Sequence, residues 1–243
     1  MATGLGMMRL EAVGRRFSDD ARWVLADINL SLQKGEFVCL AGPSGSGKTT
    51  LMRIIAGLDK PDQGQRLLPA RPPRIAMVFQ EPRLVPWLTA LDNLLLIIGR
   101  TEISRARGLL HMVELDECES SYPGQLSGGM QRRLALARAL SIEPDLLLLD
   151  EPLVSLDPAL EERMGSVLQR YWLDHQPAVI MVTHDPRQSA RLASRVIGLA
   201  PSRTGLAFDE QLSGPPPGRR TDRDEASVIG RLITVYPRLP IAS

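Results

Sequence analysis

Short apolar runs alternate with helical patterns along most of the chain. Apolar and polar residues alternate over residues 28–32, as they do in a half-buried strand. Four later runs are continuously apolar: 37–40, 75–79, 146–149 and 178–182. Such runs are typical of central strands in a parallel sheet, and helical patterns at about 48–57 and 158–173 lie between them. The alternation predicts a mostly parallel α/β sheet.

The middle of the chain has a different pattern. Between the second and third continuous runs the sequence shows helical patterns and no strong strand, with helices expected from Thr89, at 102–113 and at 128–141. Thr89 can cap its helix because Asp92 stands at the third position. We therefore expect a helical insertion at about 83–135 within the α/β fold.

Two segments have the composition of loops. The stretch 61–73 is rich in Pro, Gly and Arg, and "SGPPPGRRTDRDE", which starts at Ser213, indicates an exposed linker. Residues 226–235 are expected to form a final short helix or strand. We accordingly predict one α/β domain at 1–212, followed by a partly flexible tail at 213–243.

A glycine-rich loop follows the first continuous apolar run. "AGPSGSGKTT" fits the pattern G-x-x-x-x-G-K-[ST], with Gly42, Gly47, Lys48 and Thr49 at the fixed positions. Glycines let successive N–H groups turn toward an anion, and the helix that starts near Lys48 adds its positive dipole end. Lys48 can reach the β- and γ-phosphates, and Thr49 offers a hydroxyl to Mg²⁺.

The loop therefore predicts nucleotide binding. A Gly/Ser turn that is followed by lysine by chance is the alternative, and the strand before and the helix after the loop disfavour it. The residues predicted to bind are Gly42, Pro43, Ser44, Gly45, Ser46, Gly47, Lys48, Thr49 and Thr50. The loop alone leaves a kinase, a GTPase, a helicase and a pump component open.

Two carboxylates end the third continuous apolar run, in "LLLLDEP". The carboxyl edge of a parallel sheet is where ligands bind. Asp150 is placed to hold Mg²⁺, and Glu151 could orient and deprotonate an attacking water. A solvated acidic turn is a common alternative, but the glycine-rich loop about 100 residues upstream makes the catalytic interpretation strong.

A second predicted anion site precedes the helix at 128–141. In "LSGGMQRRLALARAL", Ser127, Gly128 and Gly129 stand at the start of an amphipathic helix, where backbone N–H groups and a hydroxyl are free to bind an anion. The first loop can already hold the β- and γ-phosphates of a nucleotide. A second site without a lysine therefore suggests a phosphate shared between two chains, although an ordinary Ser-capped helix is the alternative.

Composition argues against several classes of protein. The 243 residues carry a net charge of +1, which argues against nucleic acid as a partner. Two cysteines are too few for a disulfide framework. The apolar runs are too short to span a membrane, and the N-terminus does not resemble a signal peptide. We expect a soluble, cytoplasmic protein whose membrane role, if any, comes through a partner.

These motifs, taken in order, resemble an ABC-transporter ATPase subunit. The run consists of the glycine-rich loop, "LSGGM", "LLLLDEP", "SLD" ending at Asp157, and His184 after "VIMVT", and it covers the chain to about residue 210. The segment "QEPRLVPWLTALDN", residues 80–93, resembles the ATPases of nitrate, sulfonate and taurine importers. A small-molecule kinase has no use for "LSGGM".

The resemblance implies a fold and several residue roles. The fold is a P-loop NTPase parallel-sheet core with an N-terminal antiparallel β-subdomain and an inserted α-helical subdomain. Phe17 matches the aromatic that stacks on adenine, and Gln80 matches the glutamine that contacts Mg²⁺ and the water. His184 matches the histidine on the γ-phosphate, and Asp157 matches a residue that touches the partner subunit. His111 and His175 are expected to be structural.

The chain departs from the family pattern at two places. Met130 stands where many ABC ATPases carry glutamine, a substitution that is frequent in the importer group. The segment 64–74 is short and rich in Arg and Pro, where the family has a fuller strand and turn, so part of the β-subdomain is expected to be trimmed. Trp87, after Pro86, is expected to face the permease, and packing inside the helical subdomain is the alternative.

The implied function is ATP hydrolysis that powers solute import. Two chains would form a homodimer around two molecules of ATP and Mg²⁺, bound to transmembrane permease subunits at the cytoplasmic face of the membrane. An extracytoplasmic solute-binding protein would take part indirectly. The alternatives are an exporter or lipoprotein-release ATPase, and a permease-free ABC ATPase that acts mechanically. The last usually has two cassettes or a long coiled-coil insertion, which 243 residues do not accommodate.

Overall fold

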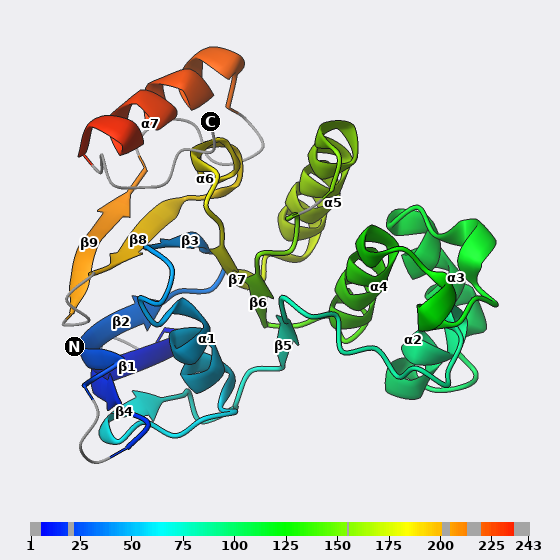
Figure 1. Cartoon of the computed structure of the whole chain (residues 1–243), viewed down its shortest axis with the longest axis horizontal. Helices are drawn as coiled ribbons and strands as arrows, with labels where there is room; N and C mark the ends of the chain where they lie inside the picture. The colour runs from blue at the N-terminus through cyan, green and yellow to red at the C-terminus, as the bar shows by residue number, and fades with distance from the viewer. Residues whose placement is uncertain (1–5, 19–21, 155, 201–204, 213–219, 236–243) are drawn as a thin grey trace.

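A six-stranded sheet forms the centre of the molecule (Figure 1). The computed structural model describes residues 6–18, 22–154, 156–200, 205–212 and 220–235. The strands, in their order across the sheet, are β5 (Ile75–Val78), β6 (Leu146–Asp150), β7 (Ala178–Val182), β3 (Phe37–Ala41), β8 (Arg195–Leu199) and β9 (Leu206–Gln211). All are parallel except β9, which pairs with β8 antiparallel. The predicted parallel α/β sheet is confirmed.

A second sheet of three antiparallel strands packs against the first. It contains β1 (Met8–Arg15), β2 (Leu25–Leu32) and β4 (Gln63–Leu67), in the order β2-β1-β4. The strand expected at 28–32 is confirmed as part of β2. The expected loop at 61–73 is wrong, because β4 lies within it. β4 is an edge strand whose first three residues are exposed, so it carries no apolar alternation.

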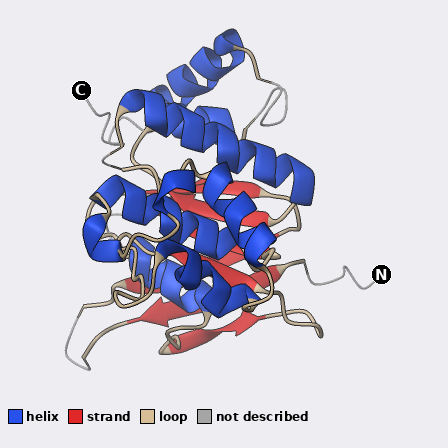
Figure 2. Ribbon diagram, turned by 90° about the vertical axis from the view of Figure 1, so that its right-hand side faces the viewer, coloured by secondary structure: helices blue, strands red, loops and turns tan. Residues whose placement is uncertain are grey.

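The helices fall into two groups. α2 (Ala90–Ile98), α3 (Ile103–Met112) and α4 (Gly128–Leu140) contact one another and form the helical insertion, together with the 3₁₀ turns Asp116–Cys118 and Pro123–Gln125. Figure 2 shows these helices in front of the strands. As predicted, the Thr89 hydroxyl caps α2 by accepting from the Asp92 N–H at 3.1 Å. The others are α1 (Lys48–Ala56), α5 (Pro158–His175), α6 (Pro186–Leu192) and α7 (Asp222–Val235).

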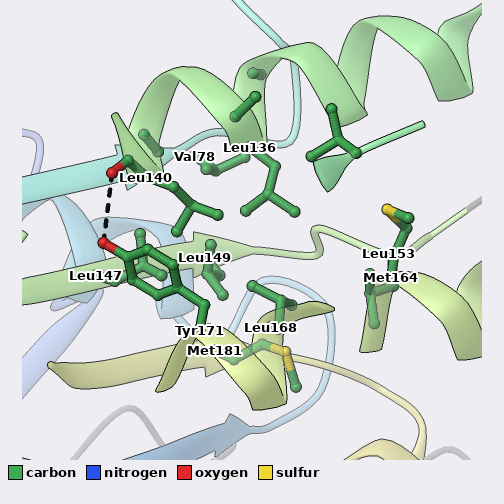
Figure 3. Packing of buried hydrophobic residues seen from close by; sticks show 14 of the residues in the cluster. Val78, Leu136, Leu140, Leu147, Leu149, Leu153, Met164, Leu168, Tyr171 and Met181 are labelled. Atoms are coloured by element: carbon green, nitrogen blue, oxygen red, sulfur yellow. Dashed lines mark hydrogen bonds between the residues drawn. The ribbon is translucent and has the colours of Figure 1, made fainter. Parts of the chain in front are cut away.

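The central sheet has a hydrophobic core on each face. Alternate residues of β3 and β6 point to opposite sides, so Cys39 and Leu149 belong to one core and Leu40 and Leu148 to the other. The first core lies between the sheet and α4, α5 and α6, and the second between the sheet, α1 and the antiparallel strands. Figure 3 shows the first core, where the Tyr171 hydroxyl donates to the carbonyl oxygen of Leu140 at the end of α4. Packing on both faces of the sheet thereby holds the central strands, and with them their carboxyl ends, in place.

The last part of the chain closes the sheet on one side. Three elements were not predicted from the sequence: α6 has only seven residues, β9 is half exposed, and β8 is buried throughout but contains Arg195 and Gly198 within its apolar run. The final element, expected as a helix or strand at 226–235, is the helix α7, which starts earlier and packs against α6 (Figure 1). The linker expected at 213–225 lies mostly outside the described residues. Among the described helices, none has the length and apolar character that a membrane crossing needs.

Candidate functional site

The glycine-rich loop joins β3 to α1 at the carboxyl edge of the central sheet. Gly42, Gly45 and Gly47 have φ values of 152°, 74° and 95°, which L side chains rarely adopt. A Cβ on Gly47 would lie 2.8 Å from a methyl group of Leu25, so the loop also needs glycine for space. The hydroxyl of Ser46 is buried and has no hydrogen-bond partner within the described part of the chain. An anion with oxygens in this loop would supply one.

Lys48 is folded back onto this loop. Its Nζ donates to the carbonyl oxygens of Gly42 at 2.8 Å and of Pro43 at 3.0 Å. Burial lowers the pKa of Lys48, and the nearby negative charges of Glu151 and Asp150 oppose this shift. The ammonium group therefore already lies over the loop, where a phosphate would replace carbonyl oxygens as its partner.

Thr49 and Asp150 meet across the sheet edge. The Thr49 hydroxyl donates to Asp150 Oδ2 at 3.0 Å, although 101 residues separate them in the sequence. Burial raises the pKa of Asp150, while the hydrogen bond from Thr49 lowers it. A hydroxyl and a carboxylate at this separation are hard oxygen ligands of the kind that Mg²⁺ takes. Among the described residues no three His, Cys, Asp or Glu side chains gather as a metal site.

Three of the predicted catalytic side chains converge beside this pair. His184 Nε2 lies 2.6 Å from one carboxylate oxygen of Glu151, and Gln80 Nε2 donates to the other at 3.4 Å. The three residues follow β7, β6 and β5, which are neighbours in the sheet. Glu151 has a φ of 52°, a strained backbone for a residue other than glycine. Strain of this kind clusters at functional sites, because it aims a side chain where relaxed backbone would not.

The second predicted anion site lies elsewhere on the molecule. Ser127 caps α4, and its hydroxyl accepts from the Met130 N–H at 3.2 Å. Gly128 and Gly129 form the first turn, and a Cβ at Gly128 would meet no atom within 4 Å. Figure 1 shows α4 beside α2 and α3, well away from α1 and the end of β3. Within one chain, Ser127 and Gly129 thus do not join the glycine-rich loop.

Asp157, Phe17 and Trp87 take three different positions. The Asp157 side chain caps α5 by accepting from the Leu160 N–H at 2.9 Å. Phe17 is 66% exposed beyond β1, with the guanidinium of Arg15 at 5.4 Å from its ring centre. Trp87 is 75% exposed, so the alternative that it packs inside the helical subdomain is wrong. Phe17 and Trp87 are therefore both accessible to a ligand or a partner.

The two remaining histidines have local contacts. His111 Nδ1 lies 2.7 Å from a carboxylate oxygen of Asp116 on the surface, and the His175 ring stacks on Tyr171 with 4.2 Å between ring centres.

Two residues near the site were not predicted from the sequence. Gln188 and Glu161 line a pocket of about 230 Å³ together with Glu151 and His184. Neither belongs to a recognised motif, so no signal in the sequence pointed to them.

Sequence comparison places the chain in one family. The family model described as "ABC transporter" matches residues 25–154, which is more than half of the chain. The aliphatic sulfonates import ATP-binding protein SsuB 1 of Nocardia farcinica is 46% identical over 213 residues, covering 87% of this chain and 85% of the relative. SsuB 2 of Streptomyces avermitilis is 45% identical over 218 residues, covering 89% and 84%.

Solved structures agree with this placement. The chain resembles the dimeric ATP-binding cassette MJ0796 in a post-hydrolysis state with ADP and Pi bound, with a TM-score of 0.78 and 33% identity over 86% of this chain and all of that one. A second dimeric structure of the same cassette gives a TM-score of 0.77. These likenesses confirm the expected fold, in which a P-loop NTPase core carries an antiparallel β-subdomain and a helical subdomain. The chain therefore belongs to the ABC transporter family, and within that family it is a subunit that binds and hydrolyses ATP.

Proposed function

We propose that the chain powers the import of aliphatic sulfonates by hydrolysing ATP. The observation that carries the chemistry is the convergence of Glu151, His184 and Gln80 beside the pair of Thr49 and Asp150. The solute class is supported by the relatives, whose names specify aliphatic sulfonates. Nitrate and taurine are the other solutes that the segment 80–93 allows.

Each nucleotide group has a proposed partner in the site. The N–H groups of the glycine-rich loop and Lys48 hold the phosphates, and the exposed ring of Phe17 stacks on adenine. Thr49, Asp150 and Gln80 would hold Mg²⁺, which neutralises charge on the phosphates when it is bound. Glu151 accepts a proton from the attacking water, and His184 contacts the γ-phosphate. Positioning and charge neutralisation carry most of such a reaction.

A second copy of the chain completes the proposed site. Ser127, Gly128 and Gly129 present N–H groups at the start of α4, a helix that lies with α2 and α3 and apart from α1 (Figure 1). In a head-to-tail dimer they would meet the γ-phosphate that the partner holds, and Asp157 would face the same interface. The dimeric form of the related cassette supports this arrangement.

The remaining proposed partners lie in and beyond a membrane. Permease subunits would bind the helical subdomain at the cytoplasmic face, and a solute-binding protein outside the cell would deliver the cargo. The closed dimer would stabilise one permease state, and hydrolysis would release it. Export, lipoprotein release and mechanical work without a permease are the competing functions, and each predicts a different phenotype.

Growth of a strain that lacks this chain tests the proposal. The strain is grown with ethanesulfonate or taurine as the sole sulfur source, with nitrate as the sole nitrogen source, and with sulfate and ammonium as controls. We expect loss of growth on ethanesulfonate alone, restored by the parent chain but not by Lys48→Ala. Lys48→Ala removes the phosphate partner, together with the hydrogen bonds to the carbonyl oxygens of Gly42 and Pro43. Normal growth on ethanesulfonate would contradict sulfonate import, and a sensitivity to added solutes instead would indicate export.

A further inference from the structure

A chain of hydrogen bonds joins the turn that carries His184 to the first turn of α5. The Thr183 hydroxyl accepts from the Asp185 N–H at 3.1 Å and donates to Gln188 Oε1 at 2.6 Å. The other atom of the same amide, Gln188 Nε2, donates to Glu161 Oε1 at 2.7 Å. Gln188 therefore bridges α6 and α5 through its side chain, as does Arg191, whose Nη2 donates to Ser166 Oγ at 2.8 Å.

Both ends of this chain reach residues of the proposed site. Thr183 and Asp185 flank His184, so the hydroxyl fixes the turn on which the imidazole stands. At the other end, the Glu161 N–H donates to the carbonyl oxygen of Asp157 at 2.8 Å in the first turn of α5. Asp157 is the N-cap of α5, so its side chain fixes where the helix begins.

Only an amide satisfies both neighbours of residue 188. Thr183 is 7% exposed and its hydroxyl already accepts a hydrogen bond from the Asp185 N–H, so the hydroxyl proton needs an acceptor. The Glu161 carboxylate only accepts, so it needs a donor. A carboxylate at position 188 would satisfy Thr183 but would repel Glu161, and an apolar side chain would leave the Thr183 hydroxyl without an acceptor and remove the donor to Glu161.

We propose that Gln188 is a positioning residue that couples His184 to the segment around Asp157. The inference rests on the proposed function, in which Asp157 faces the partner chain and His184 contacts the γ-phosphate. When the partner arrives and shifts the start of α5, Glu161 moves with it, and Gln188 carries the shift to the turn of His184. Arrival of the second copy is thereby linked to the placement of a group at the reacting phosphate.

Reversing the hydrogen-bond polarity tests this coupling. Gln188→Glu places two carboxylates against each other, and we expect kcat for ATP hydrolysis to fall about tenfold or more, since small displacements of a positioned group are costly. KM for ATP should stay within about twofold, because the groups that bind the nucleotide are unchanged. Glu161→Gln keeps an acceptor for Gln188 and should retain most of the parent activity.

The double variant, Gln188→Glu with Glu161→Gln, provides the rescue. In this variant the amide at position 161 on α5 donates a hydrogen bond to the carboxylate at position 188 on α6. In the parent the hydrogen bond runs from position 188 to position 161. That carboxylate still accepts from Thr183, so we expect kcat to return to within about threefold of Glu161→Gln. The control is Gln211→Glu on β9, at the opposite edge of the sheet, which places a second carboxylate beside Glu36, whose Oε1 lies 3.4 Å from Gln211 Nε2 and from Arg195 Nη1. Its kcat should equal that of the parent.

Several outcomes would overturn the inference. A parent-like kcat for Gln188→Glu, or a double variant no faster than Gln188→Glu, excludes the coupling. If Gln188→Glu does not fold, Gln188→Met removes both hydrogen bonds without adding charge, and a parent-like kcat there has the same meaning. His184→Ala separates the coupling from the proposed role of His184: if it is slow while Gln188→Glu is normal, only the coupling fails, and if it is normal, the role of His184 and the coupling both fail.

Discussion

Cys39 lies in the middle of β3, the strand that leads into the glycine-rich loop. Burial raises the pKa of its thiol to about 12, and a hydrogen bond to Ser189 opposes the shift. We expect Ellman's reagent at pH 8 to label only the half-buried Cys118 in the native protein, and both thiols in denaturant. Cys39→Ala should leave the native count unchanged and lower the denatured count by one. Labelling of Cys39 in the folded chain would show that β3 opens.

The same thiol gives stability a pH dependence with a defined sign. The folded thiol keeps its proton up to a pKa of about 12, whereas an ordinary thiol loses it near 9.0. Between these values the folded state binds more protons, so the free energy of unfolding falls as the pH rises from 9.0 toward 12. Denaturant titrations of the parent and of Cys39→Ala across this range should show the smaller fall in the variant.

Individual site residues differ in how far their sequence predicts them. Lys48 and Thr49 belong to a loop whose glycines and spacing are set by local backbone geometry, so the pattern alone identifies them. The contact between Glu151 and His184 depends instead on β6 and β7 being neighbours, which no local pattern states. Gln188 and Glu161 are ordinary helix residues, and only the tertiary structure brings them together.

At the scale of elements, Arg220 joins the end of α6 to the chain that leads into α7. Its Nη1 donates to the carbonyl oxygens of Ala190 and Ala193, which α6 leaves unpaired at its end. We expect Arg220→Ala to lower the free energy of unfolding by about 1.5–3 kcal/mol, the range for hydrogen bonds that involve a charged group. Arg223→Ala, an exposed neighbour in α7, is the control for urea titrations. Equal effects of the two substitutions would contradict a specific role for Arg220.

Most elements with a continuous or periodic apolar face could be predicted, but β8, which is buried throughout, was not. β3, β6 and β7 are buried on both faces, so their sequences are apolar throughout. β4 pairs with β1 through backbone groups while its side chains meet water, and Gly64 adopts a φ of 72° beside the bulge in β1. Pairing of that kind leaves no apolar signature, which explains why this strand was expected to be a loop.

For the whole molecule, Trp87 gives a test of coupling to a permease. The side chain is 75% exposed on the helical subdomain, where an aromatic anchor fits an interface. We expect Trp87→Ala to weaken permease binding by about 2 kcal/mol or more, while basal ATP hydrolysis and melting temperature stay at the parent values. Leu173→Ala, which truncates an exposed apolar side chain on α5, is the control. Equal transport per ATP in Trp87→Ala and parent vesicles would exclude this docking site.

The central claim is that two copies enclose ATP and that Glu151 activates the water. Glu151→Gln keeps the shape of the side chain and removes its charge, so hydrolysis should fall by about 10²–10⁴. ATP binding should persist, because Lys48, Thr49 and Asp150 remain, and one negative charge beside the γ-phosphate is gone. The variant should therefore bind ATP and remain in the closed, two-chain state.

Size-exclusion chromatography with light scattering on Glu151→Gln measures this state directly. With Mg·ATP we expect a dimer and with Mg·ADP a monomer, and adding Ser127→Arg, which places bulk and charge in the shared site, should abolish the dimer. ATP hydrolysis by Glu151→Gln at the parent rate would contradict the role of Glu151. A monomer in Mg·ATP with hydrolysis blocked, or a dimer that survives Ser127→Arg, would contradict the shared site.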